Sequence, residues 1–183
     1  MDREKKIYNL KSAILVALFS VIIFICSRIA IPTVIPFTLQ SLGVFLSLSI
    51  LGGKRGLLAI CLYISMGFIG LPISASGESA FALFVGPTAG YFIGWLLCGV
   101  IFWLFEAIFG SERRIRLISL AVGTLICYIS GMLWFLFAYS QNLTADGVWF
   151  AFYTCVIPFI AVDALKLFVA DKISEALHKR VQI

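Results

Sequence analysis

Long apolar runs, separated by short breaks of polar residues, glycine or proline, dominate this sequence. One of them, from Leu117 to Ser140, contains no charged residue. A stretch of roughly 18 or more apolar residues indicates a membrane-spanning helix. With breaks placed at proline, glycine and charge clusters, the pattern predicts six helical segments. Their ranges are Lys11–Ala30, Pro36–Leu51, Lys54–Ile69, Thr88–Phe109, Arg116–Ser140 and Pro158–Leu177.

The composition also indicates an integral membrane protein. Hydrophobic residues make up 62% and charged residues 13% of the 183 residues, whereas soluble domains contain about 45–50% and about 25%. We predict one all-α membrane domain, residues 1–183, with a short basic segment at 1–11 and a tail at 178–183. The run from Ala13 to Ser27 follows basic residues as in a signal peptide, but no small-residue cleavage site follows it, so we expect a retained helix.

The positions of the basic residues predict the orientation. The chain has 14 Lys and Arg, and all except Arg28 and Lys166 fall on the side of the N-terminus when the six segments alternate across the membrane. Basic residues concentrate in cytoplasmic loops. We therefore predict that both termini lie in the cytoplasm.

The outer half of the predicted bundle is irregular. The second and third segments have about 16 residues each, where about 20 are needed to cross the hydrocarbon layer. The missing length falls in Ile31–Pro36 and Leu71–Pro87, which proline and glycine interrupt. Non-helical backbone at membrane depth is tolerated only where protein buries it or where it lines a cavity. We therefore expect a pocket in the outer third.

Two charged residues in the last segment, Asp163 and Lys166, stand out within FIAVDALKLF. Residues three apart share a helix face, and a charge in a membrane helix costs at least about 2.5 kcal/mol. The pair is therefore a candidate binding site at the floor of the pocket. The alternative is a self-neutralising pair that only packs the bundle. Arg28, near the outer end of the first helix, lines the pocket or instead extends to the membrane interface.

Four stretches in order, IPFTLQSLGVFL, GLLAICLYISMGFIGLPISASG, GPTAGYFIGW and PFIAVDALK, resemble the BioY family. Its members are the biotin-specific substrate-capture (S) components of energy-coupling factor (ECF) transporters. The resemblance covers about Ile31 to Lys166. It implies a six-helix protein of the prokaryotic cell membrane that binds biotin from outside with high affinity. It also implies two kinds of partner, a transmembrane coupling (T) component and a pair of ATPases.

The resemblance also implies residue roles. Asp163 and Lys166 belong to the biotin site, and the loop Pro36–Gln40 covers it. Ala13 and Ala17 form a small-xxx-small pair that lets another helix approach closely, and similar alanine pairs in the family contact the T component. Ordinary packing against the protein's own helices is the alternative for this pair.

Biotin carries a cyclic urea, an apolar ring with sulfur and a chain ending in carboxylate. Asp163 suits the urea N–H groups, because charge-assisted hydrogen bonds are the stronger ones. Lys166 suits either the urea carbonyl or the ligand carboxylate, and the sequence leaves both open.

Further polar residues near the expected pocket are candidates for ligand contacts. Thr38, Gln40 and Ser79 offer hydrogen bonds, and Tyr91 can pack on the ring. The alternative for Thr38 and Gln40 is that they satisfy free N–H groups in the first turn of the second helix. The alternative for Tyr91 is a place in an interfacial aromatic belt.

The sequence contains no phosphate-binding loop of the G-x-x-x-x-G-K-[ST] type, and its one histidine, His178, lies near the tail. We expect no enzyme activity, no cofactor, no metal and no nucleic-acid partner. Because we expect no ATP hydrolysis by this chain, the energy for transport comes from partners or from an ion gradient. Three alternatives remain: a solitary biotin carrier, an S component for a related small vitamin, and an assembly protein whose embedded charges bind another helix.

Overall fold

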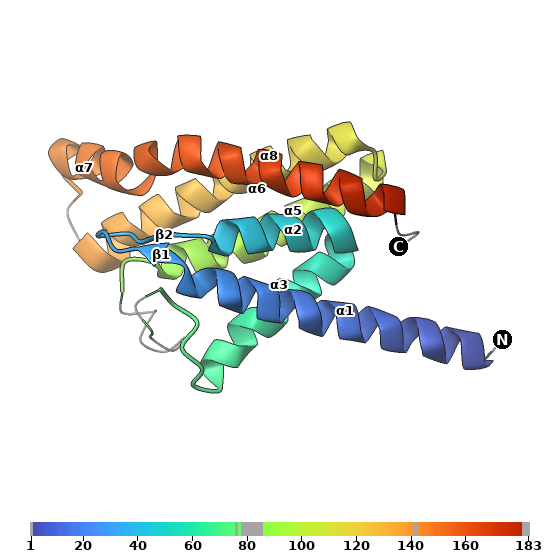
Figure 1. The fold of residues 1–183 in the computed structure, drawn as a ribbon. Helices are drawn as coiled ribbons and strands as arrows, with labels where there is room; N and C mark the ends of the chain where they lie inside the picture. Colours follow the sequence, from blue (N-terminus) through green and yellow to red (C-terminus); the bar gives the residue numbers. More distant parts are fainter. Residues whose placement is uncertain (1, 76, 78–85, 141–142, 181–183) are drawn as a thin grey trace.

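The six predicted helical segments each correspond to a helix in the computed structural model, which describes residues 2–75, 77, 86–140 and 143–180. These helices are α1 (Asp2–Arg28), α2 (Gln40–Leu51), α3 (Gly53–Phe68), α5 (Ala89–Phe109), α6 (Arg113–Trp134) and α8 (Ile157–Arg180). α1 begins and α8 ends at the same end of the bundle (Figure 1). We call this the inner end, and the opposite end, where the loops gather, the outer end.

Within the described residues, four helical stretches are long and apolar enough to cross a membrane. They are Ile7–Arg28, Ala89–Phe109, Arg113–Phe137 and Ala145–Lys179. Two shorter helices lie between the first and the second of these in the chain, α2 with 12 residues and α3 with 16 residues. The prediction of an all-α membrane protein is confirmed at this level.

The start of the second helix differs from the prediction. We expected helix from Pro36, but α2 begins at Gln40. Phe37–Thr38 instead form β2, which pairs antiparallel with β1 (Ala30–Ile31). Backbone groups of these residues bond to the paired strand, so the helix cannot begin until the hairpin ends. The hairpin extends from the outer ends of α1 and α2, which it connects (Figure 1).

The end of the fifth predicted segment also differs. The prediction was one helix over Arg116–Ser140, but α6 ends at Trp134 and the chain continues as the π-helix η1 (Phe135–Ser140). The N–H of Phe135 still reaches the carbonyl of Gly131, four residues before it as in an α-helix, and also that of Met132. Single turns of π-helix are wider than the α-helix and often occur near functional sites.

A helix that we did not predict, α7 (Ala145–Cys155), precedes α8 at the outer end. Its N-cap is Thr144, whose hydroxyl accepts a hydrogen bond from the N–H of Gly147 at 3.2 Å. Asp146 lies in the first turn, where negative charge is favourable. These capping signals are visible in the sequence, but the helix is too short for the span criterion that defined the other segments.

Glycines allow α5 and α6 to approach closely. A Cβ atom added at Gly94 of α5 would lie 2.7 Å from the Cα of Cys127, and one added at Gly90 would lie 2.4 Å from the carbonyl oxygen of Ser130. The Ser130 hydroxyl donates to the carbonyl of Gly90 at 2.8 Å. Small residues at helix contacts are the usual basis of close packing in membranes. This contact sets the separation of the two helices that carry Tyr91 and Tyr128.

We expect Gly94→Ala to destabilise the protein by about 1–3 kcal/mol, because overpacking forces the backbones apart, despite the better helix propensity of alanine. The measurement is the thermal unfolding midpoint of the purified protein in detergent. Ala107→Val, which adds bulk on the exposed side of the same helix, is the matched control and should change the midpoint little. A midpoint for Gly94→Ala at or above that of the unchanged protein would contradict the close contact.

Candidate functional site

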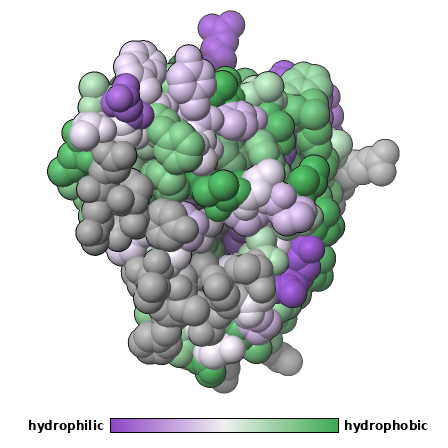
Figure 2. Space-filling model, turned by 90° about the vertical axis from the view of Figure 1, so that its left-hand side faces the viewer, coloured by the Kyte–Doolittle hydropathy of each residue, from purple (hydrophilic) through white to green (hydrophobic). Residues whose placement is uncertain are grey.

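A cavity of about 280 Å³ opens at the outer end. The β1–β2 hairpin, the loop before α5, and α2, α5, α6 and α8 contribute its walls. Figure 2 looks onto this end and shows polar residues set among hydrophobic ones. Its lining includes Thr38, Gln40, Ser41, Ser74, Tyr91, Phe92, Trp95, Tyr128, Phe159, Asp163 and Lys166. The prediction of a pocket in the outer third is therefore confirmed.

Four polar side chains form a connected cluster in the cavity wall. Asp163 Oδ1 accepts hydrogen bonds from Lys166 Nζ and from Ser41 Oγ, both at 2.8 Å. Asp163 Oδ2 accepts one from the hydroxyl of Tyr128 at 2.9 Å. Lys166 Nζ also donates to Ser41 Oγ at 2.9 Å. Helices α2, α6 and α8 therefore meet at one carboxylate.

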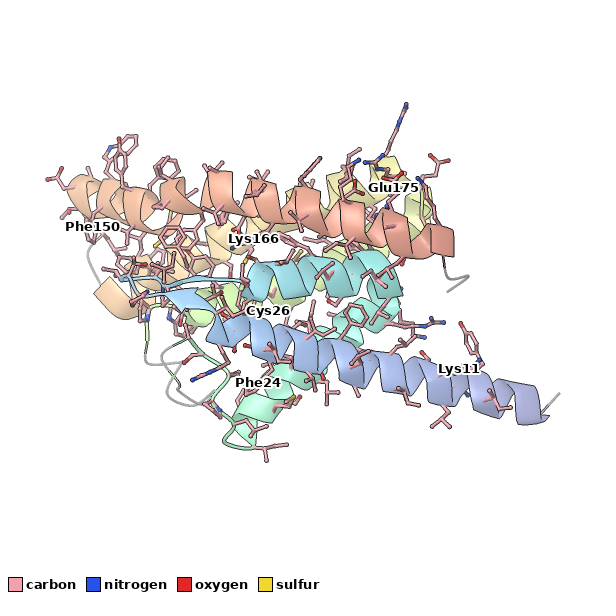
Figure 3. All side chains as sticks on the ribbon, viewed as in Figure 1. Lys11, Phe24, Cys26, Phe150, Lys166 and Glu175 are labelled. Carbon is pink, nitrogen blue, oxygen red and sulfur yellow. The ribbon has the colours of Figure 1, made fainter. Side chains whose placement is uncertain are left out.

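The central pair of this cluster is buried. Asp163 is 7% exposed and Lys166 is 6% exposed, and Lys166 lies between α8 and α2 in the bundle (Figure 3). A buried charge is tolerated only when it is paired and hydrogen-bonded, and here each charge has its counter-ion and a further polar partner. The pair is thus self-neutralised and also faces a cavity, which combines the two alternatives that the sequence left open.

The cluster leaves a defined amount of hydrogen-bonding capacity unused. A carboxylate has about four lone-pair sites and an ammonium three protons. Among the described residues, three donors contact Asp163 and two acceptors contact Lys166. One acceptor position on Asp163 and one proton of Lys166 thus remain for a ligand.

A break in the chain before α8 sets the position of the pair. Pro158 has no N–H, and the N–H of Phe159 donates to the carbonyl of Val156 at 3.0 Å. The carbonyl of Cys155 therefore accepts a hydrogen bond from the Tyr91 hydroxyl instead. This bond attaches the end of α7, just before α8 begins, to α5, about two helical turns before Asp163.

Aromatic rings form the apolar part of the wall. Phe37 and Phe159 stack with ring centroids 4.6 Å apart, and Tyr91 lies 6.0 Å from Phe159. Phe92 packs edge-on against Trp95 at 4.8 Å. Tyr91 is 8% exposed, so it is a cavity residue and not part of an interfacial belt. The cavity therefore combines apolar surfaces with one polar cluster, as small-molecule sites commonly do.

Thr38 and Gln40 line the cavity but are already engaged within the protein. The Thr38 hydroxyl donates to Gln40 Oε1 at 3.0 Å and accepts from the Gln40 backbone N–H at 3.2 Å. Gln40 Nε2 donates to the hydroxyl of Tyr63 and to the carbonyl of Ile73. Gln40 thus connects the hairpin, α3 and the following loop. The expectation that Thr38 lies in the first turn of a helix is wrong, because Thr38 belongs to β2.

Arg28 and Ser79 differ from the other sequence candidates. Arg28 is exposed and is not among the lining residues. Its Nη1 donates to the carbonyls of Pro72 at 3.3 Å and Ser74 at 3.0 Å. Because Ser74 lines the cavity, Arg28 lies at its rim and holds the neighbouring loop. Ser79 lies outside the described residues.

Ala13 and Ala17 lie on the exposed side of α1, together with Ile14, Leu18 and Val21. Packing against the protein's own helices, the alternative for this pair, therefore does not explain them. The face is apolar and has no partner helix among the described residues.

Ser41 and Tyr128 were not predicted from the sequence. Ser41 lies within IPFTLQSLGVFL, and Tyr128 lies within the uncharged run of α6. Serine and tyrosine are ordinary residues in membrane helices, so neither stands out as a buried ion does. A buried carboxylate requires hydrogen-bond donors, so the sequence does indicate that Asp163 has polar partners. It does not indicate which helices supply them.

Comparisons with known proteins identify the family of this chain. The family model described as BioY family matches residues 1–183. A protein named Biotin transporter BioY from Rhodobacter capsulatus is 32% identical, over 97% of this chain and 94% of that protein. Another of the same name from Thermotoga maritima is 33% identical, over 93% of this chain and 97% of that protein. The names describe transporters, in agreement with the expectation that the chain is not an enzyme.

The fold also matches a solved structure. The crystal structure of the S-component for biotin from an ECF-type ABC transporter superimposes with a TM-score of 0.80 at 24% identity, over 95% of this chain and 94% of that one. At 24% identity this match shows that the two proteins share a fold. The family match and the sequence relatives over nearly the whole length carry the assignment, and together they show that this chain belongs to the BioY family.

Proposed function

We propose that the chain is the biotin-binding S component of an ECF-type transporter in a prokaryotic cell membrane. The observation that carries the proposal is the buried pair of Asp163 and Lys166 in the wall of an otherwise largely apolar cavity. The names of the relatives, Biotin transporter BioY, support the choice of ligand. A T component and a pair of ATPases supply the energy.

The proposed topology has six membrane-crossing helices in one domain, with both termini in the cytoplasm. The starts of α1, α3 and α6 and the end of α8 carry the basic residues, and α1 begins where α8 ends. At about 1.5 Å per residue, α2 is too short to cross the hydrocarbon layer alone. The β1–β2 hairpin occupies the remaining depth above it, beside the cavity. The cavity then opens to the outside.

The unused capacity of the cluster suggests how biotin binds. One acceptor position on Asp163 and one proton of Lys166 match an N–H and the adjacent carbonyl on one edge of a cyclic urea. The fused rings would pack against Phe159 and Tyr91. The chain with the carboxylate would then extend toward the hairpin and the rim, where Arg28 supplies a positive charge. In this arrangement Lys166 donates to the urea carbonyl, and the ligand carboxylate lies near the rim of the cavity.

We expect Asp163→Asn to weaken biotin binding by about 100-fold or more, because it removes the charged acceptor and leaves Lys166 as an unpaired buried cation. Isothermal titration calorimetry of the purified chain in detergent measures the affinity. Asp146→Asn, at an exposed position in α7, is the matched control and should leave it unchanged. An unaltered affinity in folded Asp163→Asn protein would remove Asp163 from the site.

Two ligand analogues test which end of biotin meets the pair. In 2-iminobiotin the urea carbonyl is replaced by an imine that is protonated at neutral pH, so it should be repelled by Lys166 and bind far more weakly than biotin. Biotin methyl ester, which lacks the carboxylate charge, should keep most of the affinity. Competition with labelled biotin measures both. The reverse order would assign Lys166 to the ligand carboxylate.

The apolar face of α1 is the proposed contact with the T component. Ala13 and Ala17 leave room for a second helix to approach. We expect the double change Ala13→Leu and Ala17→Leu to reduce co-purification with the T component and the ATPases, while biotin affinity stays the same. Ala107→Leu on the exposed side of α5 is the control.

Co-purification that survives the double change would place the contact elsewhere. The solitary-carrier alternative predicts biotin uptake by vesicles that contain this chain alone. Uptake that requires the T component and ATP would exclude it.

A further inference from the structure

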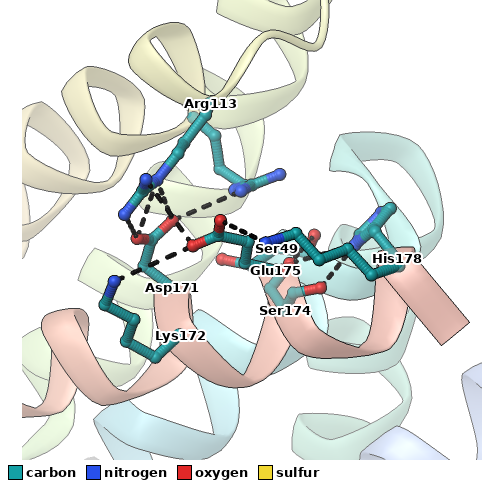
Figure 4. A network of polar contacts seen from close by, with 9 residues as sticks. Ser49, Arg113, Asp171, Lys172, Ser174, Glu175 and His178 are labelled. Atoms are coloured by element: carbon teal, nitrogen blue, oxygen red, sulfur yellow. Dashed lines mark hydrogen bonds and ion pairs between the residues drawn. The ribbon is translucent and has the colours of Figure 1, made fainter.

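Ion pairs join α6 and α8 at the inner end, far from the cavity (Figure 4). Asp171 of α8 is 2% exposed. It accepts hydrogen bonds from Arg113 Nη2 at 2.6 Å and Nε at 3.1 Å, and from Arg116 Nη2 at 3.3 Å. The Arg116 side chain is only 13% exposed. The negative charge of Asp171 is therefore neutralised by two arginines, and its shortest contact is the one with Arg113.

The remaining charges at this end are exposed and mostly positive. Glu175 Oε2 lies 3.5 Å from Arg113 Nη1 and 3.9 Å from Lys172 Nζ, and Glu175 Oε1 lies 3.1 Å from Lys179 Nζ. The side chains of Arg113, Lys172 and Lys179 are 47%, 53% and 73% exposed. The four cations Arg113, Arg116, Lys172 and Lys179 thus accompany only two carboxylates, those of Asp171 and Glu175. Exposed ion pairs are weak, so the two lysines and the Nη1 group of Arg113, which faces Glu175, are available to a second anion.

An apolar strip continues from this cluster along α8. Leu165, Phe168 and Lys172 are spaced by three and four residues, so they share one face of the helix. Leu165 is 62% and Phe168 57% exposed, and Lys172 Nζ lies 5.6 Å from the centroid of the Phe168 ring. Along this face, the exposed apolar side chains of Leu165 and Phe168 are followed by the positive charge of Lys172 toward the inner end.

We infer that this face binds an anionic phospholipid, with its phosphate between Arg113 and Lys172 and an acyl chain along Phe168 and Leu165. Guanidinium and ammonium groups form charge-assisted hydrogen bonds with phosphate oxygens. Arg113 and Lys172 both approach Oε2 of Glu175, so their charged groups lie close enough together to contact one phosphate group. The phosphate would replace Glu175 as their shared anion, and Glu175 would keep its contact with Lys179. A zwitterionic headgroup brings its own cation and gains less from the excess positive charge. Under the proposed topology the site lies in the cytoplasmic leaflet, where anionic lipids attract basic residues.

The experiment is thermal unfolding of the purified chain in an uncharged detergent, titrated with phosphatidylglycerol or phosphatidylcholine. Phosphatidylglycerol should raise the midpoint at lower concentration than phosphatidylcholine. Lys172→Gln should raise the phosphatidylglycerol concentration for the half-maximal effect about fivefold, since one basic residue near an anionic surface contributes about that factor. Lys54→Gln, which removes an exposed cation at the start of α3 at the same end, is the matched control and should leave that concentration unchanged.

A second variant tests the acyl-chain contact. Phe168→Ala should also weaken the phosphatidylglycerol effect, although it changes no charge. The ion pairs of Asp171 remain in both variants, so both should fold. Equal losses in Lys172→Gln and Lys54→Gln would overturn the inference in favour of diffuse attraction. A shift produced equally by inorganic phosphate would overturn it in favour of a free anion. None of these measurements requires biotin, so they are independent of the proposed function.

Discussion

The contact between Asp163 and Lys166 is the interaction on which the outer half of this protein depends. Neither charge is tolerated alone in a membrane interior, so each must be paired and supplied with further hydrogen bonds. Ser41 on α2 and Tyr128 on α6 supply them. The requirement therefore fixes how three helices meet. It also leaves a small, directional remainder of hydrogen-bonding capacity in an apolar cavity, which is the property that a site for a polar vitamin needs.

The two ends of the bundle meet different physical demands. At the outer end the backbone is irregular, and side chains satisfy the freed groups: Gln40 connects the hairpin to α3, and Tyr91 bonds to the carbonyl exposed by the break before α8. At the inner end the helices are joined by ion pairs around Asp171. The loops at the outer end surround the cavity, whereas ion pairs join the helices at the inner end. The close contact of α5 and α6 at Gly94 links the two.

Much of the fold followed from hydropathy, because each long helix must be apolar over the thickness of the membrane. The prediction failed where another signal was stronger. The pairing of β2 with β1 delayed the start of α2, and a capped helix of 11 residues, α7, was too short to register as a span. For the site, the charges of Asp163 and Lys166 stood out by their cost. Ser41 and Tyr128 did not, since uncharged polar groups in membrane helices are common.

Hydropathy and charge along the chain were enough to identify the class of protein, the six longer helical segments and the face shared by Asp163 and Lys166. These features depend on local periodicity and on the cost of placing charge in hydrocarbon. The residues that surround that face could not be predicted in this way, because they come from distant parts of the chain. Ser41 and Asp163 are 122 positions apart, and Tyr128 and Asp163 are 35 apart. Helical periodicity tells which side chains point the same way, but the packing of all the helices together decides what they point at.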